Sequence, residues 1–90
     1  MGKQRPAVVV SNSVQNSILD SVVVVPFSSQ EPEIPYLRIK LKLENARQMG
    51  FAVLPGIRQI KKSRILKSIG YLSPHELKKL DTALTVYLSD

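Results

Sequence analysis

The chain has 90 residues, 43% of them hydrophobic, with thirteen basic and seven acidic residues and no cysteine. This length predicts one domain over residues 1–90 with a small core, and the absence of cysteine excludes disulfides and thiolate metal sites. No apolar segment reaches the length of a membrane span and no signal peptide is visible, so we expect a cytoplasmic protein without a membrane partner. A domain this small would gain stability from a homodimer that covers apolar surface.

The net charge of +6 is unevenly distributed along the chain. Eleven of the thirteen basic residues precede Ser68, against four of the seven acidic residues. This asymmetry indicates an anionic partner, either a nucleic acid or an acidic peptide, for the first three-quarters of the chain. The alternative interpretation is a soluble basic domain that binds no polyanion.

Two β-branched runs predict the first strands. Ala7 to Val10 has the apolar continuity of a strand buried on both faces, and Val22 to Phe27 has the same character. If these strands pair antiparallel, Arg5 before the first strand lies beside Ser28 or Ser29 after the second. A guanidinium and a hydroxyl held on adjacent strands can bind a phosphate.

The next segments predict a short helix, an exposed loop and a strand with two different faces. Residues Gln15 to Leu19 are expected to form one helical turn, and residues Glu31 to Pro35 contain two prolines typical of a loop. From Leu37 to Leu43, apolar residues alternate strictly with three cations. These cations are Arg38, Lys40 and Lys42. They lie about 7 Å apart on one face of the strand, where they either face RNA or protect a solvated edge from further pairing.

The second half of the chain predicts further short elements. In order, we expect a loop at residues 44–50, an apolar run at 51–54, a turn at Pro55-Gly56, a strand at 57–60, a basic turn at 61–64 and a last strand at 65–71. The basic turn is interpreted by default as a solvated charge cluster.

A helix is clearly marked at the C-terminus. Ser73 is the expected N-cap, Pro74 takes the first helical position, and Glu76 completes a capping box. An apolar stripe at helical spacing follows, formed by Leu77, Leu80, Ala83, Leu84, Tyr87 and Leu88. The stripe indicates a helix that packs on a sheet or takes part in a dimer contact. The single histidine, His75, falls in the exposed first turn, which argues against a role as a catalytic base.

Four blocks of the sequence together resemble a known family. Residues 5–12, 22–29, 57–65 and 69–73, followed by the helix, are similar in order and spacing to the MazF/PemK-like toxins of bacterial type II toxin–antitoxin systems. The resemblance covers almost the whole chain. It implies a mainly β fold of the α+β class, namely an SH3-like small β-barrel with a C-terminal helix, assembled as a homodimer. It also implies a ribosome-independent, sequence-selective endoribonuclease that cuts mRNA.

The resemblance also implies roles for individual residues. Arg5 would stabilise the phosphorane that forms when a ribose 2′-hydroxyl attacks its own phosphate, and Ser28 aligns with a threonine that the family uses beside the arginine. The implied RNA-binding residues are Ser29, Arg38, Lys40, Lys42, Arg58 and Lys61. This chemistry needs no metal and no cofactor. The implied partners are single-stranded RNA and an acidic antitoxin that occupies the same cationic groove.

Two departures from the family pattern leave alternatives open. We expect the strand and loop that precede the Arg-Pro pair in relatives to be missing, and Pro55-Gly56 stands where many relatives carry an acidic residue. A catalytically degenerate module that binds antitoxin or RNA is therefore one alternative. Another is a gyrase-poisoning toxin of the same fold, which would depend on Tyr87 and Leu88 rather than on Arg5.

Overall fold

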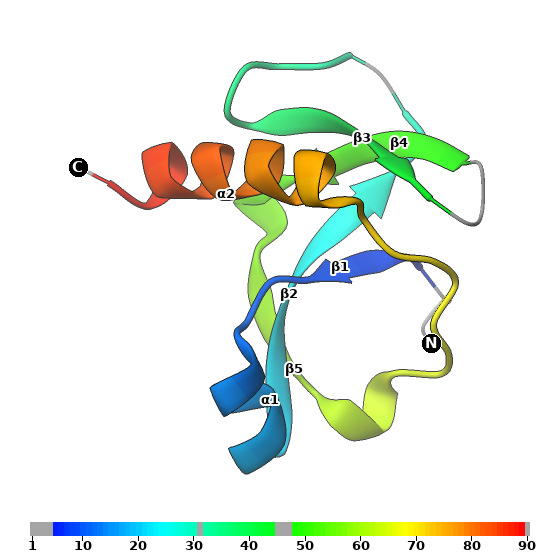
Figure 1. The fold of residues 1–90 in the computed structure, drawn as a ribbon, viewed down its shortest axis with the longest axis vertical. Helices are drawn as coiled ribbons and strands as arrows, with labels where there is room; N and C mark the ends of the chain where they lie inside the picture. Colours follow the sequence, from blue (N-terminus) through cyan, green and yellow to red (C-terminus); the bar gives the residue numbers. More distant parts are fainter. Residues whose placement is uncertain (1–4, 31, 45–47, 90) are drawn as a thin grey trace.

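A curled, five-stranded antiparallel sheet forms most of the computed structural model, which describes residues 5–30, 32–44 and 48–89 (Figure 1). The strands are β1 (Ala7–Val9), β2 (Ser21–Ser28), β3 (Arg38–Leu43), β4 (Gln48–Val53) and β5 (Arg58–Lys61). The helices are α1 (Ser13–Ile18) and α2 (Pro74–Leu88), with two 3₁₀ turns, η1 (Leu54–Gly56) and η2 (Lys62–Arg64). The predicted mainly β architecture with a C-terminal helix is confirmed. No described helix has both the length and the apolar character needed to cross a membrane.

The central strand, β2, pairs with three other strands. Ser21–Val24 pair with β5, Val24–Pro26 pair with β1, and the end of the strand pairs with β4. Pro26 lies where η1 separates β5 from β4, so its missing N–H interrupts no ladder there. Gly56 in η1 packs against this proline, because a Cβ on Gly56 would lie 2.8 Å from Pro26 Cγ. The proline and the glycine together make the junction between the two partners of β2.

The first strand, β1, is less buried than its sequence predicts. Val8 is half-buried, but Ala7 and Val9 are exposed. Within the described residues β1 pairs only with β2, which makes it an edge strand. The expectation of a strand buried on both faces was therefore wrong, because a continuous apolar run does not show whether both faces are covered.

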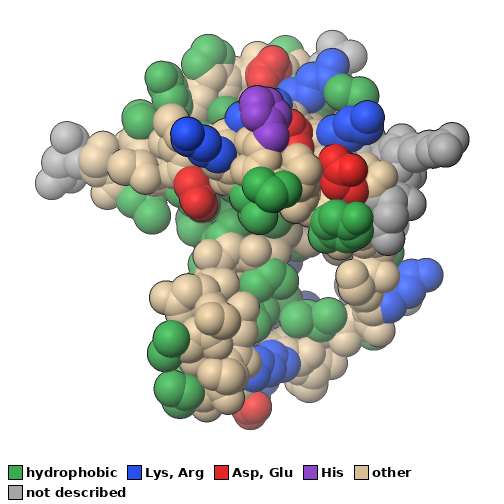
Figure 2. All heavy atoms as spheres, in the orientation of Figure 1, with side chains coloured by type: hydrophobic (Ala, Val, Ile, Leu, Met, Phe, Trp, Pro, Cys, Tyr) green, Lys and Arg blue, Asp and Glu red, His purple; other side chains and the backbone are tan. Residues whose placement is uncertain are grey.

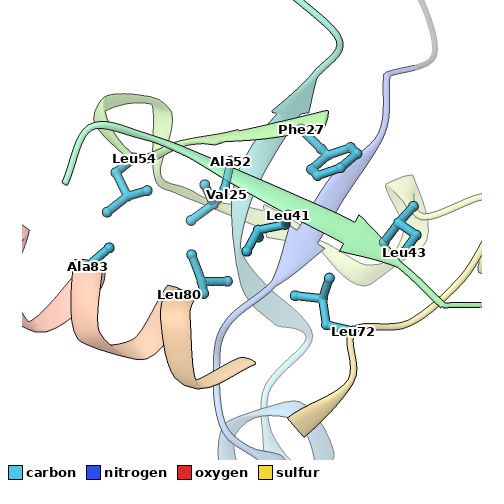
Figure 3. Packing of buried hydrophobic residues seen from close by; sticks show 9 residues of the cluster. All are labelled: Val25, Phe27, Leu41, Leu43, Ala52, Leu54, Leu72, Leu80 and Ala83. Carbon is cyan, nitrogen blue, oxygen red and sulfur yellow. The ribbon is translucent and has the colours of Figure 1, made fainter. Parts of the chain in front are cut away.

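One face of the sheet packs against α2 to form the core (Figure 3). The buried cluster consists of Val25, Phe27, Leu41, Leu43, Ala52, Leu54, Leu72, Leu80 and Ala83. In α2 only Leu80 and Ala83 are fully buried, and Leu77 and Leu88 at the ends of the predicted stripe are exposed.

The beginning of α2 follows the prediction in part. Ser73 Oγ accepts a hydrogen bond from Glu76 N at 3.2 Å, as an N-cap does. The Glu76 carboxylate does not complete the capping box on the helix. It instead accepts from Lys42 N of β3 at 2.9 Å, which ties the helix to the sheet.

Two segments of the second half differ from the prediction. Residues 65–71 form no strand; only Leu72 makes an isolated bridge with Leu43, and Glu44 N donates to Tyr71 O. Further along β3, the backbone groups of Lys40 and Lys42 at its outer edge bond to the side chains of Glu33, Glu76 and Lys79 instead of to this segment. The predicted loop at 44–50 was also wrong in part, because Gln48–Gly50 belong to β4, and residues 45–47 lie outside the described residues. Similarly, Glu31 of the predicted exposed loop is not described, whereas residues 32–35 are exposed.

Candidate nucleic-acid interface

The register of β1 and β2 brings Arg5 and Ser28 together. Ala7 is paired with Pro26, and Phe27 N donates to Pro6 O at 3.0 Å. Continuing this antiparallel register by one more residue places Arg5 directly opposite Ser28, with both side chains on the same face of the sheet. The sequence predicted this juxtaposition. The chemical roles of the two residues stay predictions.

The same face continues across the sheet toward β3. Ser28 is paired with Phe51 of β4, and Phe51 with Lys40 of β3. Because side chains alternate along a strand, Arg38 and Lys42 share this face with Lys40, and Arg58 joins it opposite Val24. We call this surface the cationic face, formed by Arg5, Ser28, Arg38, Lys40, Lys42 and Arg58. The core residues Phe27, Leu41 and Ala52 lie on the opposite face.

Two of the predicted RNA-binding residues do not lie on the cationic face. Lys61 is paired with Ser21 and lies an odd number of residues from Arg58 in β5. Side chains alternate along a strand, so the Lys61 side chain lies on the face of the sheet opposite to that of Arg58. Ser29 follows the last residue of β2 and is exposed in the loop. Its contact with RNA remains a prediction, and the register of the strands does not place its side chain.

The hydroxyl of Ser28 is oriented by the loop that follows it. Ser28 Oγ accepts a hydrogen bond from Gln30 N at 3.1 Å, and the residue is half-buried. A serine lacks the second methyl substituent that restricts the rotamer of threonine. This local hydrogen bond orients the Ser28 hydroxyl, and the hydroxyl proton stays available for donation.

Arg38 has a structural role that sequence reasoning missed. Its Nε donates to Pro32 O at 3.0 Å and its Nη2 donates to Gln30 O, while the guanidinium lies 5.9 Å from the centre of the Phe51 ring. Arg38 therefore holds the loop that follows Ser28. The acceptors are backbone carbonyls, which carry no signal in the sequence, so strand alternation alone could only predict a free cation.

The outer edge of β3 is satisfied by side chains rather than by another strand. Lys40 N donates to Glu33 Oε2 at 3.2 Å, and Lys79 Nζ of α2 donates to Lys40 O at 2.9 Å. With the bond from Lys42 N to Glu76, these contacts protect an edge that would otherwise be open to pairing. The interpretation of this strand as a charged edge is thus supported, and its cations still share a face with Ser28.

Glu33 also lines a depression on the cationic face. The depression has a volume of about 340 Å³ and is formed by Glu33, Lys40, Met49, Gly50 and Phe51. Sequence reasoning placed Glu33 only in an exposed loop and assigned it no role. No group of three or more His, Asp or Glu side chains suited to hold a metal ion occurs among the described residues.

Comparisons with known proteins show the family and the fold of this chain. The profile of the family described as PemK-like, MazF-like toxin of type II toxin–antitoxin system matches residues 1–88. A solved structure of an endoribonuclease in complex with its cognate antitoxin, from mycobacterial species, is similar with a TM-score of 0.84 and 24% identity over 93% of this chain and 80% of that chain. The Mycobacterium tuberculosis toxin MazF-mt6 is similar with a TM-score of 0.77 and 19% identity over 96% of this chain and 88% of that chain. The predicted fold is confirmed as a curled half-barrel with a C-terminal helix.

Proposed function

Since the chain belongs to the family of PemK-like, MazF-like toxins of type II toxin–antitoxin systems, we propose that it is the toxin of such a pair and a metal-independent, sequence-selective endoribonuclease that cuts mRNA. The observation that carries the proposal is the register that places Arg5 opposite Ser28 at one end of the cationic face. Two solved structures of the same fold are described as endoribonucleases, which supports the reaction class.

The proposed reaction is attack of a ribose 2′-hydroxyl on the adjacent phosphorus. The O–P bond that forms closes a 2′,3′-cyclic phosphate, and the P–O bond that breaks releases a 5′-hydroxyl, which takes up a proton. Arg5 offers two N–H groups in a rigid fork to the phosphorane oxygens. Ser28 orients the phosphate through its hydroxyl.

Proton transfer is the weaker part of this site. In η1, Pro55 and Gly56 offer no ionisable side chain, and His75 is a highly exposed residue at the start of α2. We infer that water removes and supplies the protons, so that the rate relies on charge stabilisation and positioning. The lack of an ionisable side chain in η1 is also the observation that favours the second candidate, a degenerate module that binds RNA or antitoxin without cutting.

We further propose a homodimer, a cytoplasmic location and an acidic antitoxin partner. Several large apolar side chains are exposed, among them Leu66 at 66% and Tyr71 at 61%. Figure 2 shows an open gap beside the segment that follows η2, and exposed hydrophobic side chains in the part of the view where Figure 1 places α1. A second copy would cover such surface. One solved relative is in complex with its cognate antitoxin, and an acidic segment would complement the cationic face.

The experiment is cleavage of a long single-stranded RNA in EDTA by the wild-type chain and by Arg5→Ala and Ser28→Ala variants. We expect cuts at a defined sequence with cyclic-phosphate ends, a loss of at least about a hundredfold in Arg5→Ala, and a smaller loss in Ser28→Ala. Arg64→Ala removes the same charge in η2, off the cationic face, and should cut like the wild type. A folded wild-type protein that binds RNA without cutting it would establish the degenerate module instead.

A further inference from the structure

An acidic side chain stands out on a face that is otherwise cationic. Glu33 is exposed, and its Oε2 accepts from Lys40 N at 3.2 Å. Among the described residues Glu33 forms no ion pair, although Arg38, Lys40 and Lys42 follow on the neighbouring strand. The carboxylate is thus held by a backbone amide, with Oε1 uncommitted within the described part of the chain. A phosphate would be repelled at this point, whereas a hydrogen-bond donor would be accepted.

The position of the depression relates it to the candidate catalytic pair. Its lining includes Phe51, which is paired with Ser28 on the adjacent strand, and Lys40, which is paired with Phe51. Neighbouring strands lie about 4.8 Å apart. The depression therefore begins one strand beyond Ser28, on the side away from Arg5. A nucleotide next to the one held by Arg5 and Ser28 would reach it.

The lining suits a base rather than a phosphate. Met49 and Phe51 supply apolar and aromatic atoms, and Met49 is half exposed, so a flat ring can contact its thioether. Arg38 lies over the Phe51 ring and is itself held by the carbonyls of Gln30 and Pro32. The pocket is thus preorganised before RNA arrives.

We propose that this depression is a nucleobase subsite flanking the cut, and that the Glu33 carboxylate selects a base with an exocyclic amino group over uracil. The inference rests on the proposed RNA-directed function and adds a specificity-determining residue to it. A carboxylate accepts from the amino group of cytosine, adenine or guanine. Uracil has no amino group: it presents a carbonyl oxygen where cytosine has its amino group, which the carboxylate repels, and its ring N3–H lies between two such carbonyl groups. Lys40, which also lines the depression, would contact the neighbouring phosphate.

The test is binding of a random RNA octamer pool in which every 2′-hydroxyl is replaced by fluorine, so that no cleavage is possible. The bound sequences are compared for the wild type, for Glu33→Gln and for the matched control Glu44→Gln, which makes the same change at an exposed position beyond the end of β3. We expect one position at which the wild type disfavours uracil by roughly five- to hundredfold. Glu33→Gln keeps an acceptor for Lys40 N, gains a donor, and should lose this discrimination.

The outcomes separate the inference from the function on which it rests. Loss of discrimination against uracil at one position in Glu33→Gln, with the wild-type profile kept in Glu44→Gln, supports the subsite. An unchanged base profile in Glu33→Gln overturns it while leaving RNA binding intact. Absence of binding by the wild-type protein overturns the RNA-directed function itself and the subsite with it.

Discussion

Gly50 connects core packing to the candidate site, and replacing it by alanine tests that connection. Gly50 lies in β4 beside the ring of Phe27, which belongs to the core. A Cβ at Gly50 would lie 2.6 Å from Phe27 Cε2, 2.7 Å from Phe27 Cζ and 2.9 Å from Ser28 O. The ring is buried, and the third atom is backbone of the strand that presents Ser28. The added methyl therefore has to displace a core ring or the site itself.

The direction of the change in stability on Gly50→Ala shows whether the space beside Gly50 is free or filled. In a strand with free space, glycine is less favourable than alanine by roughly 0.5–1 kcal/mol, so Gly50→Ala would stabilise the protein. The contacts predict overpacking instead, which costs about 1–3 kcal/mol. For a domain of this size, 1 kcal/mol corresponds to a change in Tm of about 4–8 °C. We expect a clearly lower Tm and urea midpoint, measured by circular dichroism.

The same substitution in a Phe27→Leu protein tests whether the loss of stability comes from the contact with the Phe27 ring. Phe27→Leu removes the ring atoms that the new methyl would contact, at the cost of a cavity. The added loss from Gly50→Ala should therefore be smaller in the Phe27→Leu protein than in the wild type, which a double-mutant cycle measures as a coupling energy. An unchanged or raised Tm for Gly50→Ala, or strict additivity of the two changes, would refute the packing argument.

Two further changes test the helix and the cationic face. Leu80→Ala removes a side chain that is only 2% exposed, so we expect the free energy of unfolding, measured by urea titration, to fall by about 3 kcal/mol. The control Leu77→Ala, at a position 44% exposed on the same helix, should lower it by less than about 1 kcal/mol. Equal losses in the two variants would contradict the assignment of Leu80 to the core. For Arg58→Ala, we expect weaker binding of a non-cleavable single-stranded RNA and a decrease of about 0.7 in the slope of log K against log salt concentration, as for the loss of one phosphate contact. The same slope in the variant and the wild type would place Arg58 outside the interface.

The predictable parts of this fold are those in which local chemistry decides the structure. Ser73 and Pro74 start a helix wherever they precede an apolar stripe, and α2 begins at Pro74. Strict alternation between Leu37 and Leu43 defines a strand in any context, and β3 lies there. The local sequence by itself favours these two elements, and tertiary contacts then stabilise conformations that are already favoured.

The other parts depend on which partners are available in space. An apolar run at 65–71 has strand character, but it pairs with none of the described strands and remains irregular. The run at Ala7 to Val10 is a strand whose exposure is set by its position at the edge of the sheet. Likewise, the contacts of Arg38 and Glu33 are made to backbone groups. Such contacts depend on the path of the loop, and composition and spacing do not specify that path.

The junction in β2 explains how the site arises from the fold. Between Val24 and Phe27, β2 changes its partner on one edge from β5 to β4, while β1 stays paired along the other edge. Pro26 and Gly56 allow this change, since the proline needs no partner there and the glycine lets η1 approach it. Ser28 therefore has Arg5 on one side and Phe51 on the other, with Lys40 beyond.

This order of residues runs across the strands rather than along them. Arg5 precedes β1 and Lys40 lies in β3, with β2 and β4 between these two strands. Three strand spacings, roughly 14 Å in total, therefore separate Arg5 from Lys40. An RNA strand that follows the cationic face would place one phosphate at Arg5 and Ser28 and the next base at Glu33. Cleavage would then take place beside β1 and β2, and base selection beside β4 and β3 of the same sheet. The turn η1, in which Pro55 and Gly56 offer no ionisable side chain, is thus also the turn at which β2 changes its partner from β5 to β4.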